Sequence, residues 1–183
     1  MGMAMTYTTE RYTAELDAKT YIDEFRNADY FIKLCQQCGN YGRRYGCPPF
    51  DEDPLSALEM YDRVRLLGVK ITPDNKNLPL EAAGELMEPV IIKLNEELLE
   101  SERVLKGRSY GFVGHCPYCG GAPCARIAGE PCRHPDKVRP SLEAIGFDIS
   151  KTAEDLLGLE IKWSQDGRIP EYLTLVCGIF YKG

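Results

Sequence analysis

Apolar positions divide the first part of the chain into segments with helical spacing and segments that alternate or stay apolar. Alternation over residues 5–16 predicts a strand. Asp17 is suited to cap a helix over 18–26, where apolar residues recur at three- and four-residue steps. The continuous apolar run VRLLGVKI at 64–71 predicts a strand that is mostly buried.

Two further helices are predicted from start and stop signals. Asp53 followed by Pro54 is typical of an N-cap with proline at the first helical position, which starts a helix over about 54–62. The longest helical pattern covers about 79–106. Pro89 lies inside this pattern, so we expect a kink there or a break into two helices.

The last third of the chain mixes both kinds of element. Residues 109–114 predict a strand that leads into a cysteine-rich segment, and short helices are expected near 140–146 and 150–158. The segments LEIKW and YLTLVCGIFY flank a polar turn that contains Asp166 and Gly167. This arrangement predicts a β-hairpin at the end of the chain.

These elements do not alternate in a steady βαβα order, which favours the α+β class. We expect an antiparallel or mixed sheet covered by helices, in a single domain that spans residues 1–183. Glycine and proline are frequent in two cysteine-rich loops, 35–50 and 115–135. We expect these loops to pack together at one end of the sheet.

Composition and charge narrow the classes of partner. The chain is 44% hydrophobic and 27% charged, as is usual for a globular protein. Its net charge is −6, whereas a nucleic-acid-binding domain normally carries an excess of Lys and Arg, so nucleic acid is not expected as the main partner. The sequence contains no run of eighteen apolar residues and no secretory signal at its start. We therefore expect no membrane partner and a cytoplasmic location, while the oligomeric state cannot be predicted.

The cysteines carry the main chemical signal. The chain has 8 cysteines, and all but Cys177 fall in two short windows. In a cytoplasmic protein, clustered cysteines indicate metal ligands more often than structural disulfides.

The second window follows the spacing C-x2-C-x4-C-x7-C. Its glycines and prolines allow the turns that four thiolates need in order to converge. Four thiolates suit a [4Fe–4S] cluster or a tetrahedral zinc ion, and the spacing alone leaves both open. The four candidate ligands are Cys116, Cys119, Cys124 and Cys132.

The first window holds only three candidate ligands, Cys35, Cys38 and Cys47, in the spacing C-x2-C-x8-C-P-P. A metal with one open position could bind a substrate, as catalytic metals do. Otherwise another group completes the site. The candidates are Cys177, His115, His134, Asp51, a cysteine of the other window and an outside molecule.

Basic, aromatic and histidine side chains in the windows could modify the surroundings of a bound metal. Basic residues could offset the negative charge of thiolate-bound metal, and tyrosines could shield it from water. His134 could donate a hydrogen bond to a sulfur. The basic residues are Arg43, Arg44, Arg126, Arg133, Lys137 and Arg139, and the tyrosines are Tyr41, Tyr45 and Tyr118.

The segments CQQCGNYGRRYGCPPF and HCPYC…EPCRHPDKVRPSLEAIGFDI resemble the DUF2284 family of predicted metal-binding proteins, as does the tail KTAEDLLGLEIKW…PEYLTLV. The likeness runs from about residue 30 to the end of the chain. It implies metal binding through the seven clustered cysteines and implies no particular reaction.

Several functions fit these observations. The favoured one is a protein that carries one or two [4Fe–4S] clusters in an electron-transfer or redox accessory role, with a redox partner protein or a small molecule as partner. One alternative is a zinc-stabilised structural or binding module without catalysis. Another is an enzyme with an open metal site at the three-cysteine loop. A dithiol–disulfide redox protein is less favoured, because the C-x2-C pairs lie in Gly/Pro loops.

Overall fold

The computed structural model describes residues 5–111 and 116–183. Four antiparallel strands form one sheet in the order β1-β2-β4-β3. The strands are β1 (Tyr7–Asp17), β2 (Arg63–Pro73), β3 (Arg108–Tyr110) and β4 (Leu173–Tyr181). The α+β class and the antiparallel sheet are therefore confirmed. Of the strand expected over 109–114, residues 112–114 lie outside the described residues.

The two central strands are buried on both sides. In their register Leu66 lies opposite Gly178 and Leu67 opposite Cys177, so successive pairs point to opposite faces. One face packs residues such as Leu66 and Phe180 into a first core, and the other packs Cys177 into a second core. Apolar residues on consecutive positions of β2 follow from this, because both of its faces are covered.

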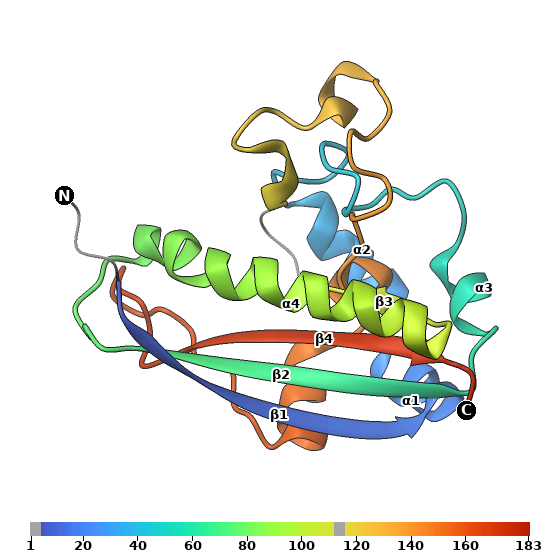
Figure 1. Ribbon diagram of the computed structural model, residues 1–183, viewed down its shortest axis with the longest axis horizontal. Coiled ribbons are helices and arrows are strands. Elements are labelled where there is room, and N and C mark those ends of the chain that lie inside the picture. The colour runs from blue at the N-terminus through green and yellow to red at the C-terminus, as the bar shows by residue number, and fades with distance from the viewer. Residues whose placement is uncertain (1–4, 112–115) are drawn as a thin grey trace.

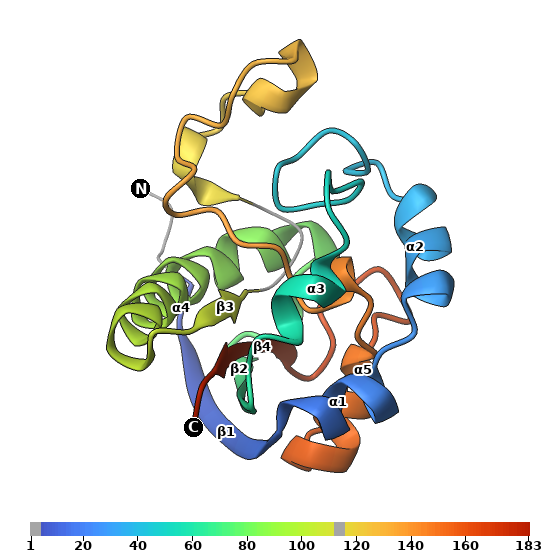
Figure 2. The ribbon, with the colours of Figure 1, turned by 90° about the vertical axis from the view of Figure 1, so that its right-hand side faces the viewer.

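Helices cover both faces of the sheet (Figures 1 and 2). The long helix α4 (Ala83–Leu105) lies across one face and buries Leu86, Ile91, Leu94 and Leu98 against it. On the other face lie α1 (Ala18–Phe25) and α5 (Ile149–Lys151), which continues as a π-helical turn over Thr152–Leu156. Tyr21 of α1 stacks on Phe147 there, with ring centroids 4.4 Å apart.

The two predicted N-caps are confirmed. The Asp17 carboxylate accepts a hydrogen bond of 2.9 Å from the Thr20 amide, and Asp53 caps α3 (Pro54–Leu58) in the same manner. Helix α3 is shorter than the predicted span of 54–62. It ends early because the following residues lead into the sheet, where the Asp62 amide donates to the Tyr181 carbonyl.

Helix α4 runs without a break through Pro89, so of the two expected alternatives, a kink or a break, the break is wrong. A short 3-10 turn over Leu80–Ala82 precedes it. Pro89 lies in the second turn, where it removes one backbone hydrogen bond. The buried leucines on the same helix hold α4 on the sheet and outweigh this loss.

A helix that the sequence pattern did not predict, α2 (Ala28–Gln36), carries Cys35 in its last turn. The first cysteine window is therefore not entirely a loop. Asn27 caps α2 by accepting a hydrogen bond from the Tyr30 amide. No residue of α2 is fully buried, although its apolar residues recur at helical steps.

The predicted C-terminal hairpin is wrong. Strand β4 pairs with β2 and β3, so both of its edges are occupied, and residues 159–163 form no strand. The turn around Gly167 instead pairs with the segment before α4. The Leu80 amide donates to the Gly167 carbonyl, and the Ile169 amide donates to the Leu78 carbonyl.

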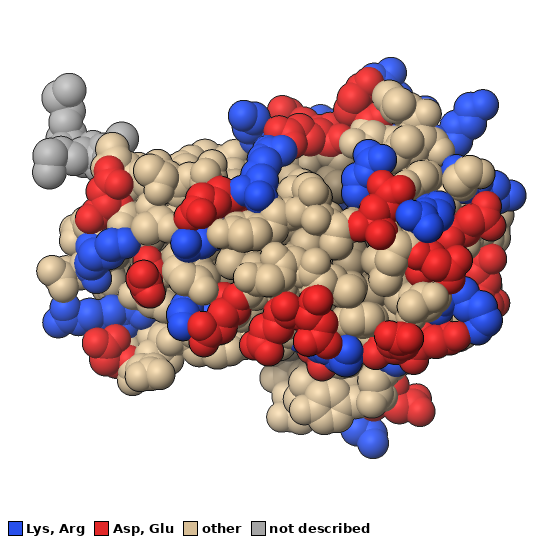
Figure 3. All heavy atoms as spheres, turned by 90° about the horizontal axis from the view of Figure 1, so that it is seen from below, with Lys and Arg blue, Asp and Glu red and all other residues tan. Residues whose placement is uncertain are grey.

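The two cysteine loops lie side by side outside the helix–sheet layers, as predicted (Figures 1 and 2). On the face of the molecule that Figure 3 shows, Lys and Arg side chains are interspersed with Asp and Glu. In the described part of the chain, no helix is long and apolar enough to span a membrane.

Candidate metal centres

The first cysteine window is built around the end of α2. Cys35 lies in the last turn of that helix, and the Cys38 amide donates to the Cys35 carbonyl at 2.9 Å. The chain then turns back, and the Gly42 amide bonds to the Pro48 carbonyl at 2.8 Å. This closed loop returns Cys47 to the neighbourhood of the other two cysteines.

The three thiols of this window influence one another. Burial raises the pKa of Cys47, the thiols of Cys38 and Cys35 raise it further, and the guanidinium groups of Arg44 and Arg126 oppose them. Burial also raises the pKa of Cys35. Cys47 is buried and Cys38 is exposed, so the set reaches from the interior to the surface. All three line a cavity of about 490 Å³.

The second window is a series of tight turns. Cys119 ends a 3-10 turn that starts at Pro117, and Gly120 and Gly121 follow with φ of 56° and 83°. These left-handed conformations favour glycine. Cys124 precedes a second 3-10 turn over Ala125–Ala128, which ends at Gly129.

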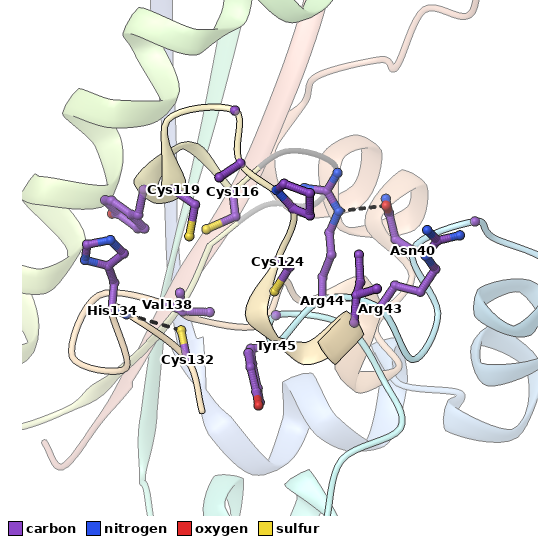
Figure 4. A pocket seen from close by; sticks show the side chains of 17 residues that line it. Asn40, Arg43, Arg44, Tyr45, Cys116, Cys119, Cys124, Cys132, His134 and Val138 are labelled. Atoms are coloured by element: carbon purple, nitrogen blue, oxygen red, sulfur yellow. Dashed lines mark hydrogen bonds between the residues drawn. The ribbon is translucent and has the colours of Figure 1, made fainter. Parts of the chain in front are cut away.

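These turns bring all four cysteines of the second window to one cavity of about 270 Å³. Figure 4 shows the sulfurs of Cys116 and Cys119 next to each other, with those of Cys124 and Cys132 turned toward the same space. Burial raises the pKa of Cys116, and the charges of the other three thiols add to the rise. The His134 amide donates to the Cys132 sulfur at 3.4 Å, so the expected bond from His134 comes from its backbone.

Arg126 joins the two windows. Its guanidinium donates to the carbonyls of Arg44 at 2.8 Å and Cys47 at 2.7 Å, and also to that of Pro49. Tyr45 adds a hydrogen bond from its hydroxyl to the Glu130 carbonyl. The sequence suggested Arg126 as a counter-charge for a metal, but the structure shows that it also binds the backbone of the other window.

A buried ion pair anchors the end of the second window to α4. Arg139 Nε and Nη2 each donate to one oxygen of the Glu102 carboxylate at 2.7 Å. Burial raises the pKa of Glu102, but the hydrogen bonds from Arg139 and Ser109 outweigh it, so the net pKa lies below its usual value. Among the other basic residues suggested as counter-charges, Arg43 and Arg44 line the four-cysteine cavity, whereas Arg133 donates to the Pro123 carbonyl.

The candidates for a fourth ligand of the first window fall in different places. Cys177 is fully buried in the core under α4, where burial raises its pKa to about 12. His134 lines the cavity of the second window, and Asp51 lines a separate cavity beside α3. His115 lies outside the described residues.

Glu143 is the acidic residue that sequence reasoning missed. It lines the cavity of the first window together with the three cysteines, and its charge contributes to the raised pKa of Cys35. A backbone hydrogen bond holds the segment of Glu143 next to α2: the Asn27 amide, at the start of α2, donates to the Gly146 carbonyl. No local sequence pattern predicts this long-range contact.

The donor sets fit thiolate-bound metal. All eight cysteines are free thiols, and seven of them line the two cavities. Among residues 5–111 and 116–183, no three Cys, His, Asp or Glu side chains are close enough together to hold a single metal ion.

Comparison with known proteins gives one match. Neither curated proteins nor solved structures show a similarity to this chain. The family model described as "Predicted metal-binding protein (DUF2284)" matches residues 21–179, a range that contains every cysteine described above. The chain therefore belongs to the DUF2284 family of predicted metal-binding proteins.

Proposed function

We propose that this protein binds [4Fe–4S] clusters through its two cysteine windows and serves in electron transfer or as a redox accessory protein. The observation that carries the proposal is the grouping of seven thiols around two adjoining cavities, four at one and three at the other. Four thiolates are the usual ligand set of a cubane cluster.

A cluster and a single zinc ion require different distances between the four sulfurs. Four sulfurs at tetrahedral zinc lie roughly 3.8 Å apart, because each Zn–S bond is about 2.3 Å long. In a cubane cluster each thiolate binds a different iron, so the sulfurs stand further apart. The four thiols of the second window face one cavity, and iron and zinc analysis distinguishes the two kinds of centre.

The surrounding residues suit a redox centre. A bound cluster supplies a group that accepts and returns one electron. Arg43 and Arg44 line the four-cysteine cavity and would offset its negative charge, which raises the reduction potential. Tyr45 and Tyr118 line the same cavity and limit the access of water. The contact between the two windows would hold two centres next to each other.

Purification without oxygen, followed by iron and sulfide analysis, tests the proposal. We expect about eight irons per chain and an absorption band at roughly 400 nm. Cys116→Ser and Cys38→Ser should each remove about half of the iron, because each affects one window. Cys177→Ala, which changes the one cysteine outside both windows, is the matched control and should keep all of it.

Two results would contradict the proposal. A colourless protein with about one zinc per set of thiolates would show that the windows are structural zinc sites. Equal iron loss from Cys177→Ala and Cys116→Ser would show that the iron is not bound by the windows.

A further inference from the structure

The cavity of the first window differs from that of the second in the charge of its wall. The second cavity is lined by Arg43, Arg44 and His134 in addition to its thiols. In the part of the chain that the structure describes, no Lys, Arg or His side chain lines the first cavity. Its ionisable groups are all acids or phenols: three thiols, the carboxyl groups of Glu143 and Asp148, and two tyrosines.

Among residues 5–111 and 116–183, no cation forms an ion pair with Glu143. No side chain or backbone amide in the described residues donates a hydrogen bond to its carboxylate. Burial raises the pKa of Glu143, and the charge of Asp148 adds to the rise. Lys151 is close in sequence, but its ammonium pairs with Asp155 at 2.6 Å and lies over the Phe25 ring. A bound cation would supply the missing charge.

Lys162, which precedes Trp163 in the sequence, is also paired with an acidic residue. Its ammonium pairs with Glu160 at 2.5 Å. The next residue, Trp163, lines the cavity and is 71% exposed. The chain therefore presents the indole of Trp163 at the opening, while the neighbouring ammonium is paired with a carboxylate.

Aromatic rings form much of the wall. Tyr30, Phe31, Tyr41 and Trp163 line the cavity, and Tyr30 is 54% exposed. Exposed apolar side chains that gather around one cavity often mark a ligand-binding site. Aromatic faces next to a carboxylate are the surroundings that bind organic cations, because the ring quadrupole attracts positive charge.

We propose that this cavity is a binding site for an organic cation, an ammonium-type group with apolar substituents, with Glu143 as its charge partner and Tyr30 and Trp163 as its aromatic walls. The inference rests on the proposed function in one respect only: the ligand would lie beside the open side of the three-cysteine centre. A volume of about 490 Å³ is in the range of small-molecule sites.

Calorimetric titration of the anaerobically purified protein tests the site with a matched pair of probes. Benzyltrimethylammonium is the cation, and 2,2-dimethylpropylbenzene is its neutral isostere of the same shape. We expect the cation to bind at least about tenfold more tightly, as one desolvated cation–aromatic contact allows. Trp163 is the only tryptophan in the chain, so its fluorescence should change on binding of the cation.

Two variants locate the site. Glu143→Gln removes the charge with little change in shape and should weaken cation binding about tenfold while leaving binding of the neutral probe unchanged. Asp51→Asn is the matched control, because Asp51 lines the neighbouring cavity, and it should leave both affinities unchanged. Circular dichroism of each variant checks that it is folded.

The outcomes separate this inference from the cluster proposal. If iron-loaded protein binds the two probes equally, or if Glu143→Gln binds the cation as the parent does, the inference is wrong and the cluster proposal stands. If the protein holds no iron, the cluster proposal is wrong. The same titration then still decides the inference, because Glu143 and the aromatic wall do not depend on a metal.

Discussion

Arg126 of the second cysteine window donates a 2.7 Å hydrogen bond to the carbonyl of Cys47, the last cysteine of the first window. The same guanidinium reaches the carbonyls of Arg44 and Pro49. Carbonyl oxygens within a loop have few backbone partners, so one planar group with several donors can fix the loop. The position of Cys47 therefore depends on a residue that lies far away in the sequence.

Arg126→Ala should loosen the first window. The loss of three charge-assisted hydrogen bonds predicts a fall of about 2–4 kcal/mol in the free energy of unfolding. We also expect a loss of the iron bound at Cys35, Cys38 and Cys47, because Cys47 is no longer held. Urea unfolding and iron analysis measure the two effects. Arg133→Ala is the control, since the hydrogen bond of Arg133 to the Pro123 carbonyl stays within its own window. An equal effect of both variants would show that Arg126 has no special role.

The Glu102–Arg139 pair predicts a loss of stability in acid. The pKa of Glu102 in the folded protein is lowered, so its contribution is fully present above the unfolded value near 4.5 and is lost as the pH falls through the folded value. Both side chains are nearly buried, at 13% and 11% exposed. Glu102→Gln should therefore lower the free energy of unfolding by about 1–3 kcal/mol at pH 7, and by less as the pH falls through the folded pKa.

Glu97 on the same helix is the control for that experiment. It pairs with Arg11 at 2.7 Å, but both side chains are well exposed. Exposed pairs contribute about 0–1 kcal/mol, so Glu97→Gln should change the unfolding free energy little at either pH. Urea unfolding at pH 7 and pH 3 measures both variants. If Glu102→Gln were no more costly than Glu97→Gln, the buried pair would not anchor the second window.

Local signals in the sequence predicted much of the fold. Asp17 and Asp53 are caps as expected, and the continuous apolar run of β2 reflects a strand covered on both faces. The hairpin at Asp166-Gly167 was predicted from equally clear turn chemistry and is wrong. Turn residues specify that the chain reverses, but pairing across the sheet decides which strand lies next to β4.

The grouping of the thiols around two cavities was predictable, but the surroundings of the thiols were not. The spacing of the cysteines is a local property, and it indicated both thiol sets. The approach of Glu143 to Cys35 depends on backbone contacts between the start of α2 and the segment around Gly146. Such contacts between distant segments leave no periodicity in the sequence. The wall of the three-cysteine cavity could therefore not be foreseen.

Metal removal should leave the sheet folded. The described members of both cores include none of the seven candidate ligands. Cys47 is the one candidate ligand among the described residues that is buried, and it lies outside both cores. After treatment with a chelator under reducing conditions, we expect far-UV circular dichroism to change little, while limited proteolysis cuts within 37–50 and 116–138. The iodoacetamide reaction of the metal-free protein should modify exposed Cys38 well before buried Cys177. Cooperative unfolding on chelation would contradict this prediction.

Two glycines near the ends of α4 should respond to alanine in opposite directions. A Cβ atom at Gly107 would lie 2.3 Å from the carbonyl oxygen of Phe180, which belongs to the backbone of β4 and cannot move aside cheaply. Gly107→Ala should therefore push the end of α4 off the sheet and lower the free energy of unfolding by about 1–3 kcal/mol.

At Gly84, near the start of the same helix, a Cβ atom meets nothing within 4 Å. Alanine has the higher helix propensity, so Gly84→Ala should raise the free energy of unfolding by about 0.5–1 kcal/mol. Urea unfolding of both variants measures the difference, and iron content checks that the cysteine windows are unaffected. Since the chemical change is identical, a difference in sign can come only from the close approach of α4 to β4 at Gly107. If both variants were stabilised, that approach would not be as close as the structure has it.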